Sequence, residues 1–160
     1  MGQVKNQFER VQRAFAGVLN NRNQNLVEYE DNAWGFFLHC WHLKDWIKND
    51  TKGVAKATRE KIEIEVNSYP ALVMVGDLAN KSKHLKVTTS VTEADGTQRT
   101  QRTVSGFVHV DGEDGTHKSG QGTGGILLLV VDSNGDEFPV KKLATDAMKN
   151  WMAIIKKYRI

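Results

Sequence analysis

The stretch from Asp31 to Asn49 constrains the fold most, because it is apolar on nearly every side of a helix. At about 100° per residue, one side of that helix collects five apolar residues, Ala33, Phe36, Cys40, Leu43 and Ile47. A helix at the surface of a globular protein shows a single apolar stripe, whereas this one has further aromatic residues around it. We therefore expect it near the centre of a helical bundle, with Asp31 or Asn32 as its N-cap.

Three further helices are expected in the first half of the chain. An apolar residue recurs at every third or fourth position from Val4 to Val18, which predicts a helix that ends at Asn20. A third helix is expected over residues 54–66 and a fourth over residues 71–83. Pro70 separates these two, at a place where proline suits the first turn of a helix.

The second half of the chain changes character, with many valine and threonine residues and with glycine at the joints. The dipeptides Asp95-Gly96 and Asn134-Gly135 are typical of tight hairpin turns. Residues 125–131 are expected to form a well-buried strand. A last helix has an apolar face made by Leu143 or Ala144, Met148, Trp151 and Ile155.

These elements predict an α+β fold in one domain. A bundle of about four helices would occupy residues 1–84, an antiparallel meander of about four strands residues 85–140, and a C-terminal helix residues 141–160. A small meander is stable only when something covers its apolar face, and the last helix can do so.

Two of the predicted helices carry a polar line with the same spacing. The residues, at positions i, i+3 and i+7, are His42, Asp45 and Asn49 on the second helix and Asp77, Asn80 and His84 on the fourth. Side chains at this spacing stack along one side of a helix. If the two lines face each other, one pocket would hold two imidazoles, two carboxylates and two amides.

Three kinds of site fit that composition. A buried polar network would satisfy the hydrogen bonds of these side chains and only hold the helices together. An acid–base site would use His42, Asp45 and His84 as catalytic groups, because a histidine beside a carboxylate titrates near neutral pH. The binding residues would then be Asn49, Asp77, Asn80 and Lys83. A zinc, manganese or iron site uses similar ligands, but the HExxH and ExxH spacings of helical metal sites are missing, so we predict no metal and no other cofactor.

The blocks WGFFLHCWHLKDWIKND and VGDLANKSKHLKV resemble an uncharacterised family of small bacterial proteins. Members of that family carry an HLxDW helix followed by a helix that ends in DLxNxxKH. The resemblance covers about residues 28–90, and it implies the fold and the location of a site more than an activity.

A shorter resemblance, to HEPN ribonucleases, is carried by ANKSKH, from Ala79 to His84. The hallmark of that superfamily is an arginine, a polar residue, three variable residues and a histidine, and here Asn80 and His84 match it. Its members are helical, commonly dimeric, and typical of toxin–antitoxin and phage-defence systems. The resemblance implies a HEPN-like helical core in which His84 handles a proton of the RNA. The arginine position holds Ala79, so Lys81 or Lys83 would have to supply the phosphate contact without the fork of a guanidinium.

The bulk properties exclude some classes of protein. A formal charge of +3 and a pI of about 9.0 are mildly basic, which allows nucleic acid as a partner but does not indicate it. Cys40 is the only cysteine, so no internal disulfide can form, and a reduced cytoplasmic compartment is the simplest interpretation. The longest apolar run, Ile126 to Val131, is far too short to cross a bilayer, and we expect no membrane partner.

Together these patterns favour a cytoplasmic binding or accessory module built around the His/Asp/Asn cluster. Its partner would be another protein, a second copy of the chain, or RNA or a nucleotide. The alternative is a HEPN-like ribonuclease or a hydrolase acting on nucleotides, in which His84 and His42 perform acid–base chemistry.

Overall fold

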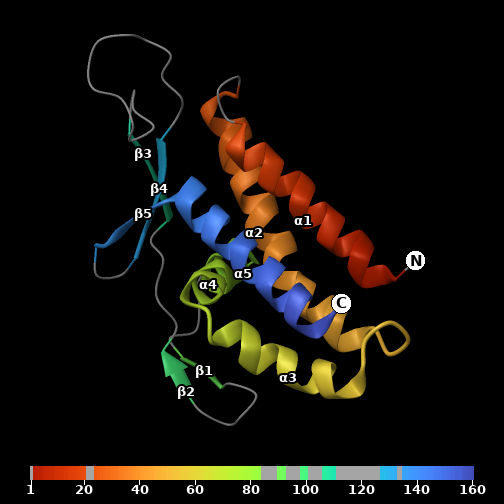
Figure 1. The fold of residues 1–160 in the computed structure, drawn as a ribbon. Helices are drawn as coiled ribbons and strands as arrows, with labels where there is room; N and C mark the ends of the chain where they lie inside the picture. The colour runs from red at the N-terminus through yellow and green to blue at the C-terminus, as the bar shows by residue number, and fades with distance from the viewer. Residues whose placement is uncertain are drawn as a thin grey trace.

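The computed structural model describes residues 2–20, 24–83, 90–92, 98–100, 106–110, 127–132 and 135–160, with side chains for 2–20, 24–81, 128–132 and 135–160. Its helices are α1 (Gln3–Leu19), α2 (Leu26–Asn49), α3 (Lys56–Asn67), α4 (Pro70–Lys83) and α5 (Val140–Tyr158) (Figure 1). The strands in this part of the chain are β1 (Ser90–Thr92), β2 (Gln98–Thr100), β3 (Gly106–Val110), β4 (Leu127–Val131) and β5 (Glu137–Pro139). The predicted α+β fold, with a helical bundle first, antiparallel strands next and a helix last, is confirmed.

Helix α2 begins earlier than the sequence analysis expects. Its N-cap is Asn25, whose side-chain oxygen accepts a hydrogen bond of 2.9 Å from the backbone N–H of Glu28. The Glu28 carboxylate in turn accepts one of 3.0 Å from the backbone N–H of Asn25. This reciprocal pair is a capping box and satisfies two backbone donors that a helix start leaves unpaired. The prediction of Asp31 or Asn32 as the cap is therefore wrong, and α2 runs for 24 residues.

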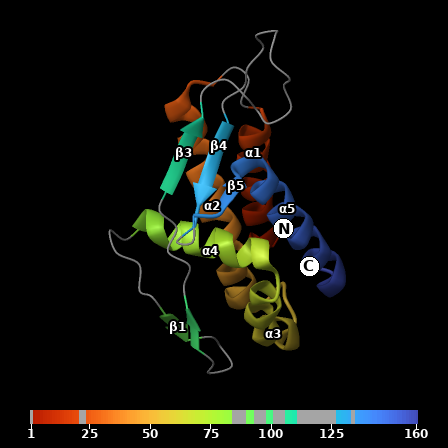
Figure 2. The same ribbon diagram turned by 90° about the vertical axis from the view of Figure 1, so that its left-hand side faces the viewer.

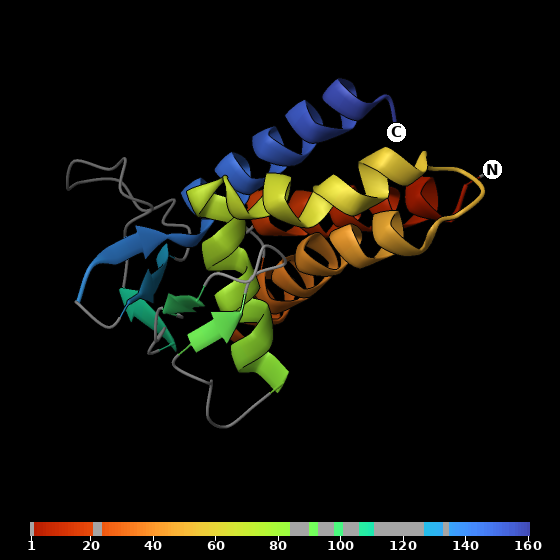
Figure 3. The same ribbon diagram turned by 90° about the horizontal axis from the view of Figure 1, so that it is seen from below.

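The apolar face of α2 lies at the centre of the core, as predicted. Its five residues, Ala33, Phe36, Cys40, Leu43 and Ile47, are all fully buried. Helices α1 and α5 run alongside α2 and pack against it (Figures 1 and 3). From α1, the ring of Phe15 lies 5.8 Å from that of Phe36, and from α5 the whole of Trp151 is buried. No helix in the described part of the chain is long and apolar enough to cross a membrane.

Helix α4 crosses α2 instead of running alongside it (Figure 2). The contact depends on Gly76, because a Cβ atom at that position would lie 2.6 Å from the ring of Trp41 on α2. Real Cβ atoms do not approach other atoms so closely, so the missing side chain lets the indole lie flush on α4. Leu72, Val75 and Leu78 of α4 are buried in the same core.

The strands form two antiparallel sheets, whereas the sequence analysis expected one meander of about four strands. One sheet pairs β1 with β2, and the other has the order β3-β4-β5. The predicted hairpin is present between β4 and β5, and Gly135 has a φ of 85°, which favours glycine, whereas Asn134 lies outside the described residues. The predicted turn at Asp95-Gly96 lies outside the described residues. Leu128 and Val130 of β4 extend the helical core, so the larger sheet packs on the end of the bundle where α5 begins (Figure 2).

Helix α5 covers both the sheet and the bundle. Leu143, Ala144, Met148 and Trp151 are buried as predicted, but Ile154 is fully buried in place of the expected Ile155. The C-terminal end of α5 is bound to α3 by polar contacts: Glu65 accepts hydrogen bonds from Lys157 at 2.6 Å and from the Tyr158 hydroxyl at 3.0 Å.

Candidate functional site

The predicted polar line of α2 lies on the side of the helix opposite its buried face. We call this side the outer face of α2, and it consists of Leu38, His39, His42, Asp45, Trp46 and Asn49. Asn49 is exposed, and the other members of the face are half-buried. The flanking tryptophans, Trp41 and Trp46, are likewise half-buried and pack only partly against the core. The polar line of α2 therefore lies at the partly exposed surface of the bundle.

Two members of the polar line open into a surface pocket. Asp45 and Asn49, together with Trp46 and Gln3 of α1, line a cavity of about 250 Å³. Gln3 and Asn49 also belong to a wider, shallow cavity of about 500 Å³ that extends over the loop between α2 and α3. The carboxylate and the two amides of this pocket therefore meet solvent at the end of the bundle where α1 begins.

Local hydrogen bonds determine the orientation of these pocket residues. The side-chain nitrogen of Asn49 donates to the backbone carbonyl of Asp45 at 2.8 Å. At the next residue along the chain, the carboxylate of Asp50 accepts a hydrogen bond of 2.7 Å from the backbone N–H of Gly53. The same carboxylate lies near Gly2, the N-cap of α1, at 3.6 Å from the position that a Cβ of Gly2 would occupy. A negative charge at the N-terminus of a helix stabilises that helix.

The polar line of α4 has a different environment. Asp77 is only 1% exposed, and Asn80 is half-buried. His42 and Asp77 are both engaged in interactions with other residues. His84 and the side chain of Lys83 lie outside the described residues. The pocket at Asp45 and Asn49 does not include Asp77, and whether His84 lies near His42 stays a prediction.

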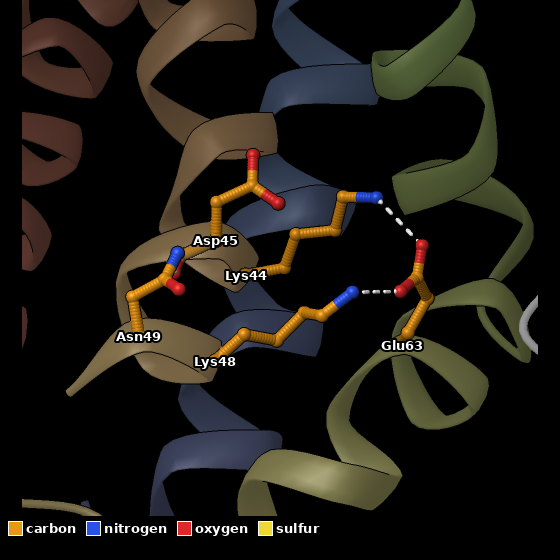
Figure 4. Close-up of polar contacts among 5 residues, drawn as sticks. All are labelled: Lys44, Asp45, Lys48, Asn49 and Glu63. Atoms are coloured by element: carbon orange, nitrogen blue, oxygen red, sulfur yellow. Dashed lines mark hydrogen bonds and ion pairs between the residues drawn. The ribbon is translucent and has the colours of Figure 1, made fainter. Parts of the chain in front are cut away.

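An ion-pair cluster that sequence reasoning missed lies on the α3 side of α2 (Figure 4). Lys44, which is 8% exposed, donates to Glu63 of α3 at 3.2 Å, and Lys48 pairs with the same carboxylate. The ammonium of Lys44 also lies 3.9 Å from the ring centroid of Trp41, a cation–π contact. Asp45 and Asn49 project from the other side of the helix, away from Glu63 (Figure 4).

The charges of this cluster hold Glu63 ionised. Burial by itself raises the pKa of the Glu63 carboxyl, but hydrogen bonds and charges from Lys48 and Lys44 outweigh it and leave the pKa below its ordinary value. The spacing of lysines four residues apart on α2 was the available sequence signal, but their common partner comes from a separate helix.

A second group missed by sequence reasoning combines α1 with α2. His39 is half-buried, and its backbone carbonyl accepts a hydrogen bond of 3.2 Å from the side chain of Gln7. Burial lowers the pKa of the His39 imidazole, and the positive charges of Arg10 and Arg13 lower it further. Burial and these two charges all act in the same direction, in favour of the neutral imidazole.

Cys40 is confirmed as a small core residue. It is fully buried, and burial raises the pKa of its thiol to about 12, although the indole of Trp151 acts in the opposite direction. A thiol with so high a pKa is almost entirely protonated at neutral pH, and the thiolate is the reactive form. Cys40 therefore contributes to packing and offers no nucleophile.

A separate apolar pocket of about 360 Å³ lies between the start of α4, β5 and the start of α5. Its walls are Pro70, Ala71, Met74, Glu137, Phe138, Pro139, Lys142, Leu143 and Asp146. Lys142 and Asp146 form an ion pair of 2.7 Å at its side, so their charges are already neutralised. The pocket contains none of the candidate catalytic or binding residues that the sequence analysis named.

Within the described residues, no three histidine, cysteine, aspartate or glutamate side chains are grouped closely enough to hold a metal ion. Comparison of the chain with protein-family models, with curated proteins and with solved structures gives no match. The two family resemblances therefore stay predictions.

Proposed function

We propose that this protein is a binding module and that the outer face of α2 contacts its ligand. The observation that carries the proposal is the open pocket at Asp45, Trp46, Asn49 and Gln3, in which unlike polar groups reach solvent beside an aromatic ring. Binding sites commonly combine a few polar groups that orient the ligand with an apolar surface that supplies contact area.

The chemistry of the pocket suits a ligand with hydrogen-bonding groups of both kinds. The Asp45 carboxylate only accepts hydrogen bonds when ionised, whereas the Asn49 and Gln3 amides both donate and accept. The exposed part of the Trp46 indole adds a flat apolar surface and an N–H donor. A peptide main chain or a small polar molecule meets these requirements. We place this activity in the cytoplasm, which agrees with the single, buried and reduced cysteine.

The test is an NMR titration of the ¹⁵N-labelled protein with defined probes, namely nucleotides, amino acids and short peptides. We expect saturable shifts of backbone amides in residues 42–50 with at least one class of probe, and no chemical conversion of that probe. The substitutions Asp45→Asn and Asn49→Ala should remove the shifts. Asp31→Asn, a matched change at an exposed position of the same helix, should leave them intact. Shifts that survive both pocket substitutions would contradict the proposal.

A ribonuclease or nucleotide hydrolase remains the second candidate. The close crossing of α2 and α4 supports this candidate. Trp41 of α2 lies against Gly76 of α4, and the next residues along the two helices are His42 and Asp77. In this candidate His84 and His42 transfer protons. Hydrolysis of RNA or of nucleotides that is lost in both His84→Ala and His42→Ala would replace the binding proposal with this one. Unchanged hydrolysis in these variants would point to a contaminating enzyme and remove the second candidate.

A further inference from the structure

The apolar pocket between α4, β5 and α5 is built from parts of the chain that lie far apart in the sequence. Its walls come from residues 70–74 at the start of α4, residues 137–139 of β5 and residues 142–146 near the start of α5. Helix α5 packs against both α4 and β5, so the core holds the three walls in place (Figure 1). A site that the fold has already formed binds a ligand at a smaller cost in conformational entropy.

The apolar walls of this pocket continue the hydrophobic core. Met74 is 5% and Leu143 6% exposed, and Phe138 packs against the same core while remaining half-buried. The pocket has a volume of about 360 Å³, and small-molecule sites begin at about 300 Å³. For comparison, a cavity of about 150 Å³ holds one benzene molecule. The pocket therefore suits a ligand of roughly two fused rings.

The wall residues favour an aromatic ligand over a flexible aliphatic one. The ring of Phe138 can pair with an aromatic ligand edge-to-face or offset, and the thioether of Met74 makes favourable contacts with aromatic rings. Pro70, Ala71 and Pro139 complete this part of the pocket, and none of them loses side-chain freedom when a ligand covers it. A rigid aromatic molecule likewise loses little freedom on binding, whereas an alkyl chain must order each of its bonds.

The charged residues at the pocket favour a neutral ligand. Lys142 and Asp146 pair with each other at 2.7 Å, so neither charge is left for a ligand. Glu137 is exposed and stands two residues before Pro139, the N-cap of α5, where the positive end of the helix dipole partly offsets its charge. An ionised ligand would lose its hydration here without gaining a countercharge.

We propose that this pocket binds a small, neutral aromatic molecule of about two fused rings. The size of the pocket, its rigid apolar walls and its paired charges carry the inference together. It is independent of the proposed function, because none of the pocket residues belongs to the outer face of α2 or to the pocket at Asp45 and Asn49.

The experiment is an NMR titration of the ¹⁵N-labelled full chain with indole-3-ethanol, which is neutral and has two fused rings. Its comparators are tryptamine, a cation, and indole-3-acetate, an anion, both on the same ring system, and octan-1-ol, a neutral aliphatic alcohol. The variants are Ala71→Phe, whose new ring would fill the pocket, and Ala153→Phe, the same change at an exposed position of α5. Circular dichroism checks that each variant folds.

We expect indole-3-ethanol to cause saturable shifts of backbone amides in residues 71–74 and 137–146. The Kd should rise at least roughly tenfold in Ala71→Phe, because a side chain that packs into the pocket takes the space of the ligand. It should stay unchanged in Ala153→Phe. Tryptamine, indole-3-acetate and octan-1-ol should each bind several-fold more weakly than indole-3-ethanol.

Unchanged affinity in Ala71→Phe would place the ligand elsewhere and overturn the inference. An ionised analogue or octan-1-ol that binds as tightly as indole-3-ethanol would overturn the ligand class. Shifts of the same amides with protein concentration alone would show that a second copy occupies the pocket, which would also overturn the inference. If Ala71→Phe does not fold, Phe138→Leu decides: the Kd for indole-3-ethanol should rise several-fold, toward that of octan-1-ol, and an unchanged Kd would contradict the aromatic contact.

Discussion

The two faces of α2 differ in what their residues do. On the buried face, Ala33, Phe36, Cys40, Leu43 and Ile47 are fully enclosed in the hydrophobic core. On the outer face, His39 and His42 are half-buried, and Asp45 and Asn49 line a surface pocket. One helix therefore stabilises the fold on one side and leaves the other side available for recognition. The following changes test this division by moving around the helix, from the largest expected loss of stability to the smallest.

Leu43→Ala on the buried face should cost the most. The substitution removes a fully buried side chain and leaves a cavity, for which the expected loss in the free energy of unfolding is about 2–5 kcal/mol. Urea denaturation followed by circular dichroism measures it. The control is Leu38→Ala on the outer face, where the same atoms are already half-exposed and the loss should be clearly smaller. Equal losses at the two positions would mean that the outer face is packed against something and would contradict the division.

Gly76→Ala tests the side of α2 that faces α4. The added methyl group would lie 2.6 Å from the ring of Trp41, and the ring cannot move aside without opening the α2–α4 contact. We expect a loss of about 1–3 kcal/mol, as for other overpacked cores, and a lower Tm. Gly35→Ala is the matched control, because nothing lies within 4 Å of a Cβ there and alanine favours a helix. A smaller Trp41→Phe ring should recover part of the loss when combined with Gly76→Ala.

Glu63→Gln tests the side of α2 that faces α3, and its effect should depend on pH. The pKa of Glu63 is lowered in the folded protein below the ordinary value of 4.5, so its ionised form favours folding. This contribution is complete above the unfolded pKa and is lost as the pH falls through the folded pKa. Glu63→Gln should therefore lower the free energy of unfolding by about 1 kcal/mol at pH 7. The difference in this free energy between variant and wild type should disappear below about pH 4.5.

The control for this pH dependence is Glu60→Gln. Its side chain is 63% exposed and pairs only with Lys56 on the same helix, so we expect a change of a few tenths of a kcal/mol. Thermal unfolding at a series of pH values measures both variants. A gap for Glu63→Gln that stays constant from neutral to acid pH would show that the charge of Glu63 does not stabilise the fold.

Asn49→Ala on the outer face should cost the least. Asn49 is exposed, and its one side-chain hydrogen bond goes to the backbone of Asp45, so the expected change is within about 0.5 kcal/mol. A change this small makes the variant suitable for binding measurements, because its fold is intact. A loss of more than 1–2 kcal/mol at the end of the helix, comparable with loss of a strong cap, would assign Asn49 to stability.

Much of the fold follows from local patterns. The spacing of apolar residues on α2 correctly predicts which of its side chains are buried, because residues three or four positions apart lie on the same side of a helix. The hairpin between β4 and β5 and the strand around Leu128 to Val130 are also correctly predicted, since glycine favours the positive φ found at Gly135. The start of α2 was misjudged because two cap signals compete, and the reciprocal bonds of Asn25 and Glu28 prevail over Asp31 and Asn32.

The candidate site was predicted only in part. The spacing of His42, Asp45 and Asn49 correctly places them on one side of α2, but spacing does not show what covers that side. The neighbouring contacts, of Gln7 with His39 and of Glu63 with Lys44, join helices that are separated along the chain. No local pattern connects such residues.

The sequence by itself therefore determined the order of the elements, the buried face of α2 and the existence of a polar line opposite it. These features depend on helical and strand periods and on turn chemistry, which act over a few residues. The tertiary structure decided that Asp45 and Asn49 open into a pocket beside Gln3, that Asp77 is buried, and that Gln7 binds the backbone carbonyl of His39. These outcomes depend on how closely the helices approach one another. Contacts such as that of Trp41 with Gly76 determine this distance.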